Sequence, residues 1–482
     1  MVNFVLAGHD FGYEVQTAIQ IFFPNRHYYP AVSVPPEGMV VKSVYTENSA
    51  EACLFIDGAP VAESVLDHSA DISEKDKKHI IKEAVFNVLS KFTGYTPKWG
   101  MITGVRPAKT ASELSAEGLS DREILEYFTG RFRVSEDKAA LALKVSRAEK
   151  EILEENRPED MSIYIGIPFC PTRCLYCSFT SYPIDRYAKK ADEYIAALSR
   201  ELRFIAENIK GRRIRSLYIG GGTPTSLSEN QFEALIDSVC GNFDTESVEE
   251  FTVEAGRPDT ITPNKLKAMR KAGVSRISVN PQTMNQKTLD IIGRRHSVED
   301  IKNAFYMARA EGFENINMDL ILGLPEEGIE DVENTMLEIE SLSPESITVH
   351  TLAVKRASRL KENIFSYDLA AADDMDKMIN LAAGYAEKMG LEPYYMYRQK
   401  AMLGNFENVG YCRRGCQSIY NIEIMEEKQT VIAAGAGGAT KLYDPVKNEL
   451  VRVFNVKSVE DYLARLDEML VRKVKAFSLN RW

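Results

Sequence analysis

The chain has 482 residues, and 44% of them are apolar, which is enough to bury the cores of about three domains. Its 59 basic and 70 acidic residues give a formal net charge of −11, which argues against nucleic-acid binding through a general positive field. No stretch reaches the ~20 apolar residues of a membrane span, and the N-terminal segment lacks the basic start of a signal peptide, so we expect a soluble, cytoplasmic protein.

The first third of the sequence predicts strands followed by helices. Residues 40–45 are rich in β-branched side chains, and Asp57-Gly58 between two apolar runs is typical of a hairpin. A helix is expected over residues 13–22, and a longer helical pattern begins at Ser73. We interpret residues 1–157 as an α+β domain that ends in a polar linker.

After the linker, strands alternate with stretches of helical periodicity. The predicted strands cover residues 162–167, 216–219, 251–254, 276–279, 315–322 and 346–351. This rhythm predicts an α/β fold with right-handed βαβ units, a (βα)6 partial barrel over residues 158–393. Reactive groups in such a barrel lie at the carboxyl ends of the strands. Residues 394–482 are less regular and are expected to form a C-terminal cap.

Three of the seven cysteines lie directly after the first of these strands. Cys170, Cys174 and Cys177 have the spacing Cys-x3-Cys-x2-Cys. A structural zinc site usually takes four ligands, and a fourth would have to come from the distant Cys412 and Cys416. Three buried, inert cysteines are a second alternative. The third is an iron–sulfur cluster held by three thiolates, which leaves one iron open to another ligand.

This spacing, with Tyr176 before the last cysteine, resembles the radical S-adenosylmethionine (SAM) superfamily. The resemblance implies one 4Fe-4S cluster whose open iron binds SAM, and one-electron cleavage of SAM to methionine and a 5′-deoxyadenosyl radical. Gly220, Gly221 and Gly222 end the second strand, where backbone without a Cβ lets a ligand approach closely. The triple glycine is therefore similar to the motif that receives the amino group of SAM.

Polar side chains also follow or interrupt three further strands. Glu254 ends the third strand, Gln282 follows the fourth, and Asp319 lies within the fifth. Such groups are costly to bury among β-branched residues unless they bind something. We therefore expect a ring of polar groups that contacts the ribose and amino-acid parts of SAM.

More narrowly, the segments YIGIPFC, GGGTPT, GVSRISVNPQT and MDLILGLP resemble the oxygen-independent coproporphyrinogen III oxidase (dehydrogenase) family, in its HemZ-type branch. By position, the resemblance implies SAM contacts from Tyr164, Tyr176, Gly221, Gly222, Thr223, Glu254, Gln282, Arg294, Asp319 and Ala353. It also implies radical oxidative decarboxylation of two propionates of coproporphyrinogen III to vinyls, giving protoporphyrinogen IX in haem biosynthesis. An electron donor such as flavodoxin or ferredoxin would be the partner.

One departure from the family pattern follows the third cysteine. The decarboxylating enzymes continue with Cys-Gly-Cys, whereas Ser178-Phe179 stands here, which resembles the related haem chaperones. A haem-binding chaperone and a radical SAM enzyme acting on another tetrapyrrole therefore remain alternatives. A substrate with several propionates requires cations at the barrel mouth. The expected substrate-binding residues are Lys355, Arg356 and Arg398.

Overall fold

The computed structural model describes residues 1–24, 26–104, 106–209, 211–355, 357–363, 366–399, 402 and 405–479. It divides into two compact units, residues 1–143 with 398–401 and residues 144–397 with 402–482. The predicted boundaries at 157 and 393 differ from this division. The segment interpreted as a linker is fixed within the second unit, because the side chain of Asn156 accepts a hydrogen bond from the buried Arg215 and donates one to Glu423, both at 2.6 Å.

The N-terminal unit contains a five-stranded sheet in the order β2-β1-β3-β4-β5. Its strands are β1 (Val2–Ala7), β2 (Tyr28–Ala31), β3 (Met39–Tyr45), β4 (Ser49–Ile56) and β5 (Ala59–Asp67). β1 is parallel to β2 and β3, whereas β3, β4 and β5 are antiparallel. The predicted hairpin joins β4 to β5, and its turn residues Asp57 and Gly58 have φ of 49° and 78°, as this tight turn requires.

Helices of the N-terminal unit complete its core. They are α1 (Gly12–Phe22), α2 (Glu74–Thr93), α3 (Pro107–Ala116), α4 (Asp121–Glu126), the π-helical turn η1 (Tyr127–Arg131) and α5 (Glu136–Leu153), which continues into the second unit. Ser73 caps α2, since its hydroxyl accepts a hydrogen bond from the N–H of Asp76 at 3.1 Å. Val15 of α1 and Val85 of α2 pack with Leu54 of the sheet in one apolar core.

The second unit is built on an eleven-stranded sheet whose middle is the predicted barrel. The barrel strands are β6 (Asp160–Ile167), β9 (Arg213–Gly221), β10 (Glu250–Glu254), β11 (Arg276–Ser278), β12 (Ile316–Leu322) and β13 (Ser346–Thr351). They are parallel and lie in the order β6-β9-β10-β11-β12-β13. All six predicted strands are present, which confirms the partial barrel.

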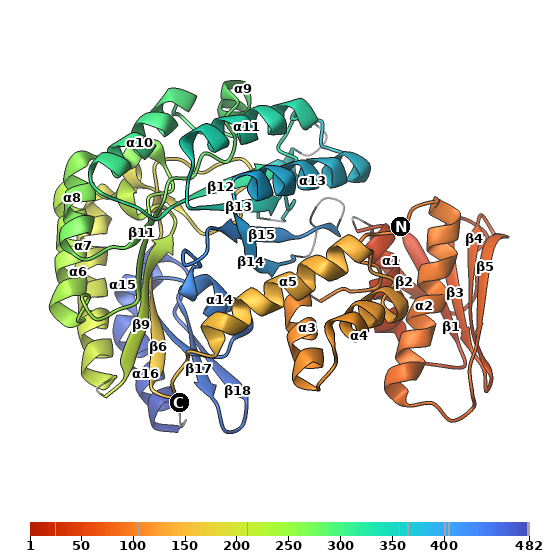
Figure 1. Ribbon diagram of the computed structural model, residues 1–482. Coiled ribbons are helices and arrows are strands. Elements are labelled where there is room, and N and C mark those ends of the chain that lie inside the picture. Colours follow the sequence, from red (N-terminus) through yellow and green to blue (C-terminus); the bar gives the residue numbers. More distant parts are fainter. Residues whose placement is uncertain are drawn as a thin grey trace. The chain divides into compact units, whose positions relative to one another are not determined.

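Helices connect these strands and run along their outer side (Figure 1). They are α6 (Ile184–Asn208), the short turn η2 (Pro224–Ser226), α7 (Glu229–Asn242), η3 (Pro258–Thr260), α8 (Pro263–Lys271), α9 (Gln286–Ile291), α10 (Val298–Ala310), α11 (Ile329–Leu342), α12 (Arg359–Glu362) and α13 (Ala372–Lys388). A small pair of strands, β7 (Phe169–Cys170) and β8 (Tyr182–Pro183), encloses the cysteine loop. In the described parts of the chain, every helix is too short or too polar to cross a membrane.

The C-terminal region extends the barrel sheet at both ends instead of forming a separate cap. Its elements are β14 (Glu392–Tyr397), β15 (Asn408–Cys412), α14 (Ile419–Glu426), β16 (Thr430–Ala434), β17 (Ala439–Asp444), β18 (Glu449–Phe454), α15 (Val459–Ala464) and α16 (Leu466–Leu479). β15 is antiparallel to β13, and β16 is parallel to β6. The expected cap did not include this pairing, because the partner strands are distant in the chain.

A buried ion pair joins the last helix to the first barrel helix. The ammonium of Lys473 in α16 lies 2.7 Å from a carboxylate oxygen of Glu201 in α6, and neither side chain is exposed. Glu201 also accepts hydrogen bonds from the hydroxyl of Tyr462 at 2.6 Å and from the N–H of Gly435 at 2.8 Å. This network holds the C-terminal helices and the loop after β16 against the barrel.

Lys473→Met should destabilise the protein strongly. Removal of one partner of a buried pair leaves the other charge uncompensated, which costs about 3–5 kcal/mol. Denaturant unfolding of the second unit checks this, with the exposed Lys475→Met on the same helix as the matched control. Equal unfolding midpoints for the two variants would contradict the assigned role.

Candidate active site

The three cysteines lie in a loop at the carboxyl end of the first barrel strand. The N–H of Leu175 donates a hydrogen bond to the carbonyl of Ile292, and its carbonyl accepts one from the N–H of Leu360, both at 3.0 Å. The guanidinium of Arg173 donates to the carbonyl of Ala357. These bonds fix the loop to segments that follow β11 and β13, which lie far along the chain.

The thiols are close enough to influence one another. Burial raises the pKa of Cys170 to about 11; the hydroxyl of Thr223, 3.5 Å from its sulfur, opposes this rise, and the neighbouring Cys177 and Cys174 add to it. Nη1 of Arg257 lies 4.0 Å from Sγ of Cys174. Buried thiols of this kind ionise when they bind a cationic metal centre.

The three thiols are the donor set of a 4Fe-4S cluster that leaves one iron open. Among the residues that the structure describes, no three His, Cys, Asp or Glu side chains converge on one metal position. In a 4Fe-4S cluster each thiolate binds its own iron, so the ligands enclose a larger volume. Cys170, Cys174 and Cys177 would hold the cluster, and the fourth iron would remain open.

The three glycines are required by how closely the glycine loop approaches the cysteine loop. A Cβ on Gly222 would lie 2.6 Å from the carbonyl oxygen of Phe169 and 3.0 Å from Sγ of Cys170. A Cβ on Gly220 would lie 2.8 Å from the carboxylate of Glu254, and Gly221 has φ of 114°. A side chain at Gly222 would therefore require the two loops to move apart, one at Gly220 would displace Glu254, and one at Gly221 would be strained by the backbone conformation.

One side chain in each of five barrel strands is partly exposed although the residues directly before and after it in the chain are buried. These side chains are Tyr164 in β6, Tyr218 in β9, Glu254 in β10, Asp319 in β12 and His350 in β13. Because the strands are parallel and adjacent, the five residues line one inner surface that solvent reaches. The sequence predicted Tyr164, Glu254 and Asp319 but missed Tyr218 and His350.

Three stacked tyrosines form one part of this surface. The ring of Tyr218 lies 4.3 Å from that of Tyr420 and 6.1 Å from that of Tyr164, between centroids. The carboxylate of Glu254 accepts hydrogen bonds from the hydroxyl of Tyr218 at 2.7 Å and from the N–H of Gly221 at 3.1 Å. Burial raises the pKa of Glu254 to about 7. Tyr420 comes from α14, so local sequence patterns gave no signal for it.

Asp319 is held by side chains from the loop after β11, from β12 and from β13. The side-chain amides of Asn280 and Asn317 donate to its carboxylate at 2.8 and 2.7 Å. Nε2 of His350 lies 3.9 Å away, and Nδ1 of the same ring lies 3.4 Å from the hydroxyl of Tyr397. Burial alone would raise the pKa of Asp319, but His350 and Asn317 bring it below its usual value. The carboxylate is thus ionised and oriented.

Arg294 connects this surface to the cysteine loop. Its guanidinium donates to the carbonyl of Asn280 and interacts with Tyr176 and Cys174. Burial would lower the pKa of Arg294, and these two neighbours raise it above its usual value. Arg294 and Tyr176, both expected to contact SAM, therefore lie beside the same thiol.

Lys355 also lies close to the cysteine loop. Its ammonium is 5.8 Å from the ring centre of Phe179, and burial lowers its pKa while the charge of Cys177 opposes this. Ala353 forms an isolated bridge with Met402 just after β13. Arg356, the neighbouring predicted cation, lies outside the described residues.

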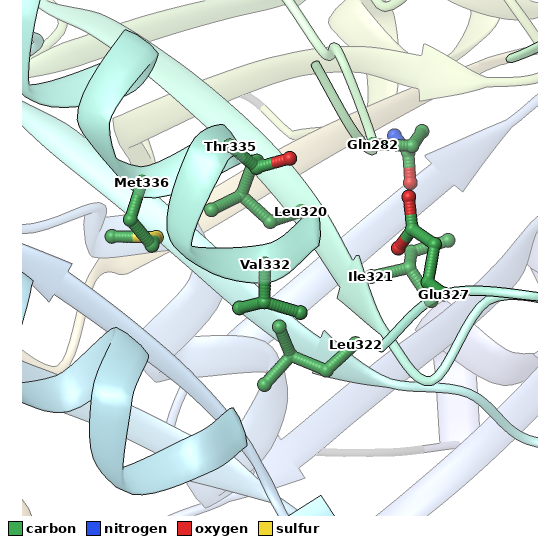
Figure 2. Close-up of a pocket in the computed structure, with 8 residues that line it drawn as sticks. All are labelled: Gln282, Leu320, Ile321, Leu322, Glu327, Val332, Thr335 and Met336. Atoms are coloured by element: carbon green, nitrogen blue, oxygen red, sulfur yellow. The ribbon is translucent and has the colours of Figure 1, made fainter. Parts of the chain in front are cut away.

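The side chain of Gln282 is not brought to this site, and Arg398 is assigned to the other unit. Gln282 has a left-handed backbone with φ of 68°, and its side chain lines a small cavity between β12 and α11, where its amide points toward Glu327 (Figure 2). Arg398 belongs to the N-terminal unit, where it donates to the carbonyl of Ile102 at 2.6 Å and lies over the ring of Trp99. The sequence could not show either placement, because each depends on tertiary packing.

The second cysteine pair lies in an apolar environment. Cys412 and Cys416 pack with Tyr394 and Ile422, and burial raises the pKa of Cys412 to about 12. Their packing favours a structural role over a second metal site.

Three thiols and a glycine loop at the carboxyl ends of a six-stranded partial barrel define a radical SAM protein. Residues 164–339 match the radical SAM superfamily. The chain belongs to the oxygen-independent coproporphyrinogen-III oxidase-like family: it is 39% identical over 416 residues to HemZ of Bacillus subtilis, covering 84% of this chain and 83% of that protein. One 4Fe-4S cluster and SAM are the cofactors of this family.

Two further comparisons concern the barrel. The haem chaperone HemW of Bacillus subtilis is 40% identical over 195 residues, covering 40% of this chain and 51% of that protein. The solved structure of coproporphyrinogen III oxidase HemN from Escherichia coli has the same fold, with a TM-score of 0.53, 22% identity, and coverage of 67% of this chain and 73% of that one.

Gly222→Ala should prevent normal cluster assembly. The new Cβ would overlap the carbonyl of Phe169 and press on Sγ of Cys170, so the cysteine loop would have to shift. Iron and sulfide analysis after anaerobic reconstitution measures the effect, and we expect most of the iron to be lost. Gly241→Ala in α7, where a Cβ meets open space, is the matched control. Full iron loading in both variants would show that the close approach is not needed.

Asp319→Ala should bind SAM at least tenfold more weakly while the cluster still assembles. Loss of a hydrogen-bond acceptor for a desolvated ligand costs on the order of 1–3 kcal/mol, or roughly ten- to a hundredfold in affinity. The buried Glu327→Gln, on the helix side of β12, is the control. SAM affinity and melting temperature are measured on the same preparations. A lower melting temperature with unchanged SAM affinity would make Asp319 a purely structural residue.

Proposed function

We propose that this protein is an oxygen-independent coproporphyrinogen III dehydrogenase. It would decarboxylate two propionate side chains of coproporphyrinogen III to vinyls and release protoporphyrinogen IX. The observation that carries the proposal is the similarity to the coproporphyrinogen-III oxidase-like protein HemZ, which extends over 84% of the chain and so beyond the barrel common to radical SAM proteins.

The residues on the inner surface support SAM binding beside the cysteine loop. When bound, the cluster and SAM supply a radical that removes a hydrogen atom from the propionate. Tyr164 and Tyr176 offer ring surfaces for the nucleoside. The carboxylate of Asp319 and the carboxyl group of Glu254 offer acceptors for the hydroxyl and ammonium groups of SAM. Backbone at Gly221 and Gly222, with the hydroxyl of Thr223, provides close polar contacts without side chains in the way. Gln282 and Arg398 are not part of this proposal.

Lys355 supports an anionic substrate. Its ammonium is half-buried beside Phe179, at the edge of the cysteine loop. Burial removes water from this charge, and a substrate carboxylate would compensate for the lost hydration. The exposed ring of Phe179 offers a flat apolar surface for a pyrrole. An external donor of the flavodoxin or ferredoxin type would supply one electron for the cleavage of SAM. An oxidised one-electron carrier would accept the electron that the substrate radical releases when it loses CO2 and forms the vinyl group.

A haem-binding chaperone is the second candidate. The sequence after Cys177, Ser178-Phe179, differs from that of the decarboxylating enzymes, and 195 residues of this chain are 40% identical to the chaperone HemW of Bacillus subtilis. That match covers 40% of this chain, whereas the HemZ match covers 84%. The longer match favours the dehydrogenase.

Anaerobic incubation of the cluster-loaded protein with coproporphyrinogen III, SAM and a reductant tests the proposal. We expect protoporphyrinogen IX, two equivalents of CO2 per substrate and 5′-deoxyadenosine, because each propionate loses one carboxylate. Cys174→Ala is the control for chemistry that does not need the cluster. Stoichiometric haem binding with no product would instead favour the chaperone.

A further inference from the structure

Arg257 is a buried cation at the cysteine loop that the sequence did not identify. It follows β10, and only 3% of its surface is exposed. Its Nη1 group donates a hydrogen bond to the hydroxyl of Thr172 at 3.1 Å and lies 4.0 Å from Sγ of Cys174. A guanidinium this deeply buried is costly unless charged or polar partners surround it.

Asp259 fixes the orientation of this guanidinium on the side away from the cysteine loop. Nε and Nη2 of Arg257 donate to the two carboxylate oxygens of Asp259 at 3.0 and 3.1 Å. Asp259 also lies 3.4 Å from Nδ1 of the buried His296. A bidentate pair sets the plane of the guanidinium, so its remaining edge must face the cysteine loop.

The thiols of Cys170 and Cys174 therefore lie in different electrostatic surroundings. Cys170 has a neutral donor, the hydroxyl of Thr223. Cys174 faces the buried charge of Arg257, and it also interacts with Arg294. Arg294, however, already donates to the carbonyl of Asn280 and is an expected SAM contact, whereas Arg257 has no such role.

We propose that Arg257, oriented by Asp259, raises the reduction potential of the cluster bound at Cys174. Reduction adds one negative charge to the cluster, and a buried cation beside a ligand sulfur stabilises that charge. Hydrogen bonds to the sulfurs and the local net charge are known to set the potentials of iron–sulfur clusters. The reduction potential of the cluster in the absence of substrate does not depend on which tetrapyrrole the protein uses.

Redox titration of the reconstituted holoprotein, followed by electron paramagnetic resonance without SAM, tests the proposal. Arg257→Gln should shift the midpoint potential to a more negative value, because the positive charge is removed. Arg257→Lys should shift it less, because lysine keeps the charge but cannot form the bidentate pair with Asp259. Asp259→Asn should shift it in the opposite direction, since a negative charge is removed. Arg270 on α8 is exposed and packs over the ring of Phe313, so Arg270→Gln is the control and should leave the potential unchanged.

Two results would overturn the proposal. If Arg257 merely anchors the cysteine loop through Thr172, Arg257→Gln would load less iron, but its loaded fraction would titrate at the wild-type potential. If Arg257→Gln does not assemble a cluster, Asp259→Asn decides: a shift to a more positive potential supports the proposal, and an unchanged or more negative potential rejects it.

Discussion

The close approach of two loops is the constraint on which the rest of the site depends. β6 and β9 are parallel neighbours, and Ile167 at the end of one lies opposite Gly221 at the end of the other. The cysteine and glycine loops consequently leave the sheet side by side, with no room for a Cβ at Gly222. Thr223 is placed by the same geometry, since its N–H donates to the carbonyl of Phe169 at 2.7 Å.

The C-terminal strands support this geometry from the other side of β6. A Cβ on Gly435, in the loop after β16, would lie 2.4 Å from the carbonyl oxygen of Gly166. The same carbonyl accepts a hydrogen bond from the hydroxyl of Tyr194 at 2.7 Å. The network of Glu201 and Lys473 holds this loop in place, so the last helix contributes to the position of the strand that carries Tyr164. Residues at the end of the chain thus belong to the support of the site.

Local pattern was sufficient for the six barrel strands and for recognising the cysteine cluster. β-branched runs separated by helical stretches gave all six barrel strands, and the cysteine spacing depends on neighbouring residues alone. Placement that depends on distant contacts could not be predicted. Tyr420 enters the tyrosine stack from α14, Gln282 turns away through a left-handed backbone, and Arg398 packs in the N-terminal unit. The polar segment near Asn156 looked like a linker because its buried partner, Arg215, lies far along the chain.

The packing of Arg398 on Trp99 has a practical consequence for spectroscopy. The chain has two tryptophans, Trp99 and Trp482, so the barrel strands contain none. Trp99 is 1% exposed, and the guanidinium of Arg398 lies 5.2 Å from its ring centre. Trp482 belongs to the second unit, so a Trp482→Phe variant would leave Trp99 as the single indole. Its emission would then report on the N-terminal unit, while visible absorption of the cluster would report on the barrel. The two units can be followed separately in one sample, without an added label.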